Sequence, residues 1–177
     1  MADEQPAAGA AAAEQATPPA VSILAQYVKD LSFENPRAPM SLQPQENPPA
    51  INVDVKVSAR GLGQDNFEVG LNLTAKAGES DAMMFNVELI YAGVFRVQNV
   101  PKEHMHPFLM IECPRLLFPF ARQIVSDATR HGGFAPLMID PVDFSQIYRR
   151  DMEARAAQQK AQNGAAEEET AKDDAEE

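Results

Sequence analysis

The stretch Met83–Phe95, read as M-M-F-N-V-E-L-I-Y-A-G-V-F, decides the fold that we expect for this chain. Successive side chains of a β-strand point to opposite faces, so the odd and even positions form two separate surfaces. The odd positions are apolar or aromatic: Phe85, Val87, Leu89, Tyr91 and Phe95. The even positions place Asn86 and Glu88 between Met84 and Ile90. The stretch therefore predicts a central strand with one dry face and one mixed face, and the mixed face is a candidate contact surface.

Three further segments alternate in the same way and supply the rest of a sheet. They are residues 21–34, 51–60 and 67–75. Short turns at 61–65 and 78–81 join the later segments to one another, which is typical of hairpins. The connection 35–50 holds five prolines and is expected to be an extended loop. Together these patterns predict a four-stranded antiparallel meander with one apolar face.

Within the first strand, alternation separates apolar from acidic side chains. One side is expected to carry Ile23, Tyr27, Leu31 and Phe33. The other side is expected to carry Asp30, Ser32 and Glu34. This strand therefore adds two carboxylates to the polar surface of the predicted sheet.

Helical patterns follow the strands. Residues 101–112 are irregular and contain Pro107, so we expect a crossing segment there. A helix is predicted from Pro114 to His131, where two glycines end it. A second helix is predicted with Asp140 as its N-cap and an apolar stripe of Phe144, Ile147, Tyr148 and Met152. Strands followed by helices indicate an α+β fold, with both helices on one face of the sheet.

Composition indicates one globular domain with two low-complexity tails. The chain has 177 residues, 45% of them hydrophobic, and a formal net charge of -11. We expect a disordered Ala/Pro-rich tail at 1–20, a folded domain at 21–153 and an acidic tail at 154–177, whose beginning extends the last helix. Residues 1–20 carry -3, residues 156–177 carry -5 and the part between them carries -3, so a nucleic-acid partner is not expected.

Other features argue for a protein that stays inside the cell. No apolar run reaches the length of a membrane span, and the acidic first residues do not resemble a secretory signal. The single cysteine, Cys113, fits a reducing compartment. The four strands also offer more apolar surface than two modest helices cover, which favours a homo-oligomer that buries the helix layer.

No motif supports an enzyme, a cofactor or a metal site. Gly61-x-Gly63 lacks a third glycine and a following helix, so it is interpreted as a turn. His104 and His106 have acidic neighbours but no further spaced set of zinc ligands. Cys113 has no positioned base near it in the sequence. We therefore expect no catalytic residues and no cofactor.

Four segments carry a specific resemblance. They are K-D-L-S-F-E-N-P at Lys29–Pro36, A-G-V-F at Ala92–Phe95, C-P-R-L-L-F-P-F-A-R at Cys113–Arg122 and F-A-P-L-M-I-D-P-V-D-F at Phe134–Phe144. Over about residues 21–153 the chain resembles the SecB family of bacterial protein-export chaperones. The resemblance implies a cytoplasmic homotetramer, a dimer of dimers with helices between two sheets. It also implies that the protein holds unfolded precursor proteins and delivers them to the SecA ATPase.

The resemblance also implies three sets of site residues. The surface for SecA, whose C-terminal region is basic, maps to Asp30, Glu34, Asn86 and Glu88, and Asn86 stands where relatives often have an apolar residue. Positions that affect tetramer assembly map to Phe85, Val87, Leu89 and Tyr91. For the unfolded-chain groove we expect Ile51, Val53, Val55, Phe118, Phe120, Leu137, Phe144 and Tyr148, although a core position is an equally open interpretation for each.

An alternative function stays open at this level. The acidic sheet face would also suit an oligomeric adaptor that docks one folded basic partner and is not a chaperone. A chaperone binds several unrelated unfolded polypeptides, whereas such an adaptor ignores them.

Overall fold

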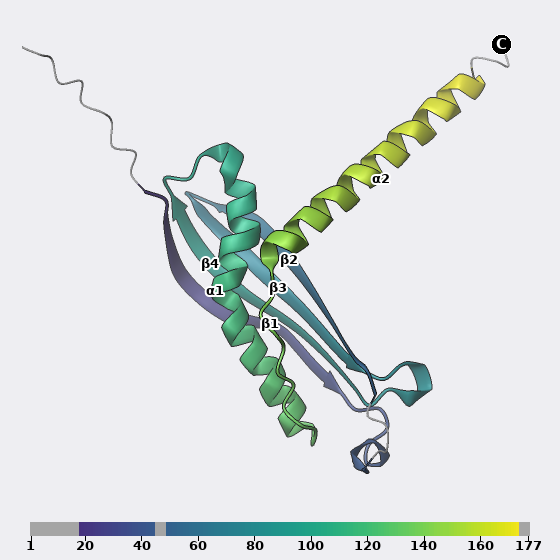
Figure 1. Ribbon diagram of the computed structural model, residues 1–177. Helices are drawn as coiled ribbons and strands as arrows, with labels where there is room; N and C mark the ends of the chain where they lie inside the picture. The colour runs from purple at the N-terminus through teal and green to yellow at the C-terminus, as the bar shows by residue number, and fades with distance from the viewer. Residues whose placement is uncertain (1–17, 45–48, 174–177) are drawn as a thin grey trace, which may run out of the picture.

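A single antiparallel sheet covered on one face by a long helix forms the body of the protein (Figure 1). The computed structural model describes residues 18–44 and 49–173, without the side chains of residues 80 and 161–173. The strands are β1 (Ala20–Glu34), β2 (Ile51–Gly63), β3 (Asn66–Ala77) and β4 (Phe85–Gln98), and the helices are α1 (Lys102–His131) and α2 (Phe144–Asp173). Two 3₁₀ turns, Met40–Leu42 and Ser80–Ala82, lie in the connections. The α+β fold class is confirmed, whereas most of the expected disordered tail 1–20 lies outside the described residues.

The strand order differs from a complete meander. β2, β3 and β4 follow one another as hairpins, but β1 pairs with β4, which gives the order β1-β4-β3-β2. The turn between β2 and β3 has two residues, Gln64 and Asp65, with φ of 51° and 60°, a conformation that matches the twist of paired strands. The proline-rich connection after β1 thus takes the chain to the opposite edge of the sheet.

Two bulges in β1 change the predicted faces of that strand. The register with β4 shifts between Ile23 and Ala25 and again between Val28 and Asp30. Each bulge inserts one residue and reverses the alternation. Tyr27 therefore pairs with Ala92 on the face away from α1, and the prediction that it shares a side with Ile23 and Leu31 is wrong. After the second bulge the alternation returns to the predicted phase.

Helix α1 is longer than predicted. It begins at Lys102, so the irregular crossing segment 101–112 is wrong, and it contains Pro107, Pro114 and Pro119. Each proline removes one helical hydrogen bond. The helix persists because its inner face is fully buried against the sheet, at Leu117, Ala121 and Val125. It ends at His131 as expected, where a Cβ on Gly132 would lie 2.1 Å from the Phe33 ring.

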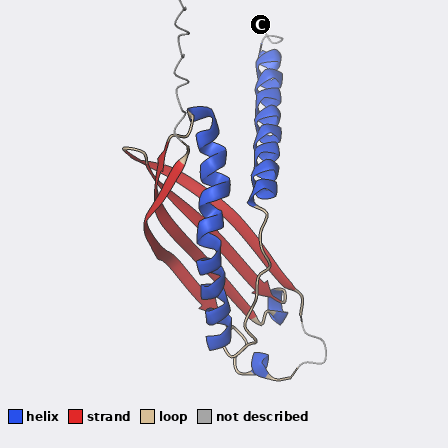
Figure 2. Ribbon diagram, turned by 60° about the vertical axis from the view of Figure 1, so that its left-hand side comes forward, coloured by secondary structure: helices blue, strands red, loops and turns tan. Residues whose placement is uncertain are grey.

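The start of α2 also differs from the prediction. Asp143, and not Asp140, accepts hydrogen bonds at the helix start, from the backbone N–H of Ser145 (2.9 Å) and Gln146 (3.2 Å). Phe144 is buried, whereas Met152 is 43% exposed, so only the first turns pack. Beyond them α2 extends away from the sheet (Figure 2). In the described part of the chain, neither helix combines the length and apolar character needed to cross a membrane.

The core lies between α1 and the inner face of the sheet. It contains the odd positions of β3 and β4, together with Leu109, Cys113, Leu117, Ala121 and Val125 of α1. The outer face of the sheet, opposite α1, carries the even positions of β2, β3 and β4. The fold thus leaves two surfaces for function, the outer face and the margins of the helix layer.

Candidate functional site

Three predicted acidic residues lie together on the outer face. Asp30 of β1 pairs with Ile90, and Ser32 pairs with Glu88, so both acids project to the side opposite α1. Glu34 pairs with Asn86 on the same face. All three carboxylate side chains are exposed. We call Asp30, Glu34 and Glu88 the acidic patch, and its binding role stays a prediction.

Asn86 connects this patch to the sheet. Its side chain is only 8% exposed, and its Nδ2 donates a 3.1 Å hydrogen bond to Glu88 Oε1. The Oδ1 atom of Asn86 is buried, and within the described residues it accepts no hydrogen bond. The amide therefore orients one carboxylate of the patch through its Nδ2 donor, while its buried Oδ1 stays unpaired within the described residues.

A shallow hollow of about 340 Å³ adjoins the acidic patch. Its lining comes from β2, β3 and β4: Asn52, Val53, Asp54, Lys56, Thr74, Lys76 and Glu88. Lys56 lies 3.1 Å from Asp54, so part of its charge is already paired. The negative charge of the outer face is therefore concentrated toward β1 and β4.

The other end of the outer face holds a carboxylate that the sequence did not single out. Glu68 is only 4% exposed and receives hydrogen bonds from Tyr27, Lys29 and Arg60. The hydrogen bond from Tyr27, supported by those from Arg60 and Lys29, lowers the pKa of Glu68 to about 2 against the effect of burial. The same bond raises the pKa of Tyr27. We call this the Glu68 cluster. The bulge that turns Tyr27 outward creates it, and no periodic pattern reveals that bulge.

Four of the predicted groove residues line one hollow at the β2 edge. The hollow has a volume of about 400 Å³ and lies between β2 and the segment that joins the two helices. Its lining is Ile51, Val53, Val55, Leu137, Met138, Ile139, Asp140, Pro141 and Val142. Ile51 is 47% exposed and Val53 is 40% exposed, whereas Val55 is buried. We call this hollow the β2 groove.

The remaining predicted groove residues do not join it. Phe118 and Phe144 are buried and pack edge to face with centroids 6.0 Å apart. Tyr148 is half-buried, and its hydroxyl lies 3.2 Å from His106 Nδ1. Phe120 stacks with Tyr91 on the inner face at 6.4 Å and is 51% exposed.

The structure places Phe120 and Phe118 on different sides of α1 for a geometric reason, and the client-binding role of each stays a prediction. Residues two apart on a helix point about 200° apart around its axis. Phe118 therefore faces the segment between the helices, whereas Phe120 turns toward the β1 half of the sheet.

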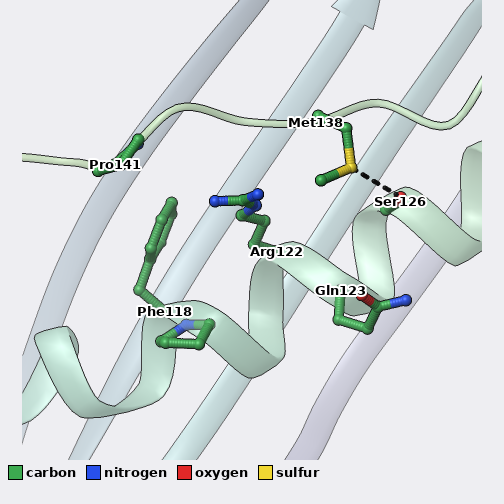
Figure 3. A pocket seen from close by; sticks show the side chains of 7 residues that line it. Phe118, Arg122, Gln123, Ser126, Met138 and Pro141 are labelled. Atoms are coloured by element: carbon green, nitrogen blue, oxygen red, sulfur yellow. Dashed lines mark hydrogen bonds between the residues drawn. The ribbon is translucent and has the colours of Figure 1, made fainter.

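A third hollow, of about 350 Å³, lies between α1 and the segment that joins the helices (Figure 3). Its lining residues are Phe118, Pro119, Arg122, Gln123, Ser126, Met138 and Pro141. We call it the α1 hollow. Met138 and Pro141 line both this hollow and the β2 groove, so the two lie on either side of the same segment.

The four predicted assembly residues lie inside the protomer. Phe85, Val87, Leu89 and Tyr91 are at most 8% exposed beneath α1, so their effect on assembly stays a prediction. An exposed apolar surface lies instead along β1, where Val21, Ile23, Val28 and Leu31 are 37% to 46% exposed. The sequence pattern showed these residues as apolar but could not show that α1 leaves them uncovered.

The described residues contain no group of three or more His, Cys, Asp or Glu side chains placed to hold a metal ion. Cys113 is buried in α1, and desolvation, aided by Glu112, raises the pKa of its thiol to about 12. The thiol therefore stays protonated at neutral pH and is a poor nucleophile.

The chain matches a known protein family and several curated relatives. The SecB family, described as preprotein translocase subunit SecB, matches residues 14–155. The protein-export protein SecB of Bradyrhizobium sp. (strain BTAi1 / ATCC BAA-1182) is 58% identical over 149 residues, 84% of this chain and 92% of that protein. The SecB of Rhodopseudomonas palustris (strain HaA2) is 58% identical over 146 residues, 82% of this chain and 92% of its own.

The fold also occurs in a solved structure. A SecB-like chaperone of Mycobacterium tuberculosis, determined in complex with a peptide from an antitoxin, matches with a TM-score of 0.56 and 14% identity. The match covers 69% of this chain and 90% of the other. At this identity the likeness concerns the fold alone.

Proposed function

The chain belongs to the SecB family of protein-export chaperones, and from this premise we propose which of its surfaces binds each partner. As a member of this family it is a chaperone for the export of precursor proteins, and this decides against the adaptor alternative. We propose that the β2 groove receives unfolded precursors and that the acidic patch receives SecA. We also propose that the exposed apolar side of β1 joins subunits, and that the protein works in the cytoplasm.

The observation that carries the client site is the partly open lining of the β2 groove. Ile51 and Val53 expose apolar surface beside an edge strand, whose outward backbone groups have no neighbouring strand in the described sheet. An unfolded chain exposes apolar side chains and unpaired backbone groups, and an edge strand beside an apolar groove binds both. A folded protein has already buried both. The groove therefore favours extended, unfolded clients.

Replacement of Ile51 and Val53 by serine tests this site. Both side chains are substantially exposed, so the fold is expected to persist while the apolar contact is lost. We expect about tenfold weaker binding of a reduced, unfolded precursor in isothermal titration calorimetry. The matched control replaces Leu62, exposed near the β2–β3 turn, and Met152, exposed on α2, by serine. Equal affinity of the Ile51/Val53 variant and the wild type would contradict the groove.

For SecA, the support is electrostatic. Asp30, Glu34 and Glu88 share one exposed face, and clustered surface charges mainly set association rate and salt dependence. A partner with a basic region fits such a face. Asn86 is polar where relatives often have an apolar residue, and in this chain its Nδ2 donates to Glu88 of the proposed contact.

The homotetramer is supported by uncovered apolar surface on β1. Val21, Ile23, Val28 and Leu31 lie on an edge strand, and Leu116 and Phe120 of α1 are also exposed. These side chains are 37% to 51% exposed, so full burial of each by a second subunit would contribute roughly 0.5 to 1.5 kcal/mol. We propose that subunits meet across this surface, as a dimer of dimers.

A charge on β1 tests the assembly. Ile23→Asp places a carboxylate in the proposed contact but outside the protomer core. Light scattering after size-exclusion chromatography is expected to show a mass below that of the wild-type tetramer. Lys102→Asp, at the exposed start of α1, serves as the control. A retained tetramer in the Ile23 variant would show that the contact lies elsewhere.

A further inference from the structure

The α1 hollow holds one charged side chain among apolar walls. Phe118 lies on one side, Met138 and Pro141 lie on the other, and the Arg122 guanidinium lies between them (Figure 3). Pro119 also lines the hollow. Ser126 donates a 3.6 Å hydrogen bond to Met138 Sδ, which links the joining segment to α1. The other two lining side chains, Gln123 and Ser126, are neutral. Arg122 is therefore the main polar feature of this space.

The N–H donors of Arg122 have no side-chain acceptor among the described residues. Arg115 is bonded to Glu112 at 2.7 Å and Arg130 to Asp127 at 2.7 Å on the same helix. By contrast, the described residues give Arg122 neither an ion pair nor a side-chain hydrogen bond, although it is half-buried. A guanidinium carries five N–H donors in one plane, and partial burial removes some of the water that would satisfy them. A ligand with oxygen acceptors would fill this deficit.

We propose that Arg122 binds main-chain carbonyl groups of an extended precursor segment that passes over Met138 and Pro141 from the β2 groove into the α1 hollow. This inference rests on the client site proposed above. It adds a residue that distinguishes unfolded clients from folded ones. The two hollows share Met138 and Pro141, so one continuous segment reaches both.

The carbonyl group is the acceptor that every unfolded client brings. An extended segment pressed between apolar walls loses water from its backbone, and an unpaired buried carbonyl is unfavourable. A planar guanidinium satisfies one or two such oxygens without regard to side-chain sequence. A folded protein has its carbonyls already paired, so Arg122 discriminates by folding state.

The test uses a short N-acetylated, C-amidated peptide of leucine, phenylalanine, serine and glycine, which has no ionisable group. Arg122→Met keeps an apolar side chain of similar reach, and we expect it to bind this peptide about tenfold more weakly in fluorescence anisotropy. Arg122→Lys keeps the charge but loses the planar fork, so its affinity is expected to lie between the two. Arg130→Met removes the same charge outside the hollow and is expected to bind like the wild type.

A second series identifies the acceptor. Peptides in which successive amides are replaced one at a time by esters carry weaker carbonyl acceptors. At one or two positions we expect an ester to weaken binding to the wild type but not to Arg122→Met, which assigns the coupling to this pair. Equal ester effects in both proteins would overturn the proposal, as would equal or tighter binding of the neutral peptide by Arg122→Met.

Two further outcomes separate this inference from its premise. Wild-type protein that binds no unfolded peptide would refute the client site itself. If Arg122→Met weakens binding only for a peptide with a central glutamate, Arg122 binds the glutamate carboxylate, and the proposal that it binds main-chain carbonyl groups is wrong. A changed oligomeric mass of Arg122→Met in light scattering would assign the hollow to a contact between subunits, which also overturns it.

Discussion

The two ends of the outer sheet face use carboxylates in opposite ways. Glu68 is almost fully buried and is held by hydrogen bonds from side chains of β1 and β2. Asp30 and Glu34 are exposed, and no ion pair involves either within the described residues. The difference shows that a carboxylate on a sheet face stabilises the fold when neighbours satisfy it, and serves binding when they leave it in water.

Glu68→Gln is expected to give the largest effect in this comparison. It removes the charge that Tyr27, Lys29 and Arg60 surround, and we expect a loss of about 1 to 2 kcal/mol in the free energy of unfolding, measured with urea. The control Asp30→Asn makes the same chemical change at the exposed end and is expected to leave stability unchanged. If both variants lose equal stability, the two ends do not differ in the proposed way.

The acidic patch is expected to show the reverse pattern. Replacement of Asp30 and Glu88 by lysine reverses two exposed charges, so we expect the fold to persist and SecA binding to weaken about tenfold at low salt in calorimetry. Glu103→Lys with Glu153→Lys changes the net charge equally on exposed helix positions and is the control. Unchanged affinity of the Asp30/Glu88 variant would count against the SecA surface.

The smallest effect is expected from pH. The pKa of Glu68 is lowered from 4.5 to about 2 by folding, so unfolding below about pH 4.5 takes up a proton there. Its contribution to stability is complete above that pH and is lost progressively as the pH falls toward 2. The stability difference between wild type and Glu68→Gln should therefore shrink below about pH 4.5. A difference that stays constant down to about pH 3 would show that Glu68 is not held as described.

Local patterns predicted β2, β3 and β4 well, because strands joined by short hairpin turns keep their alternation in register. The acidic patch was also predictable, since Asp30 and Glu34 lie after both bulges of β1, where the predicted phase returns. The Glu68 cluster was not, because a bulge depends on how β1 meets β4 and not on the residues of β1 alone. The same limit applies to the β2 groove, whose lining comes from two distant segments.

In helix α1, tertiary packing outweighs the local preference of proline against a continuous helix. Pro107 argued against one continuous helix, yet α1 contains Pro107, Pro114 and Pro119, and a proline inside an isolated helix costs about 3 kcal/mol or more. A long row of buried side chains outweighs this cost, and that burial exists only once the sheet has formed.

By itself, the sequence determined the strand alternation, the α+β class, the family and the residues of the acidic patch, because these depend on local periodicity and motifs. Only the tertiary structure decided the strand order, the outward turn of Tyr27, the continuous α1 and the uncovered side of β1. Each of these depends on which distant segments meet, and burial and hydrogen bonding between them outweigh local preferences.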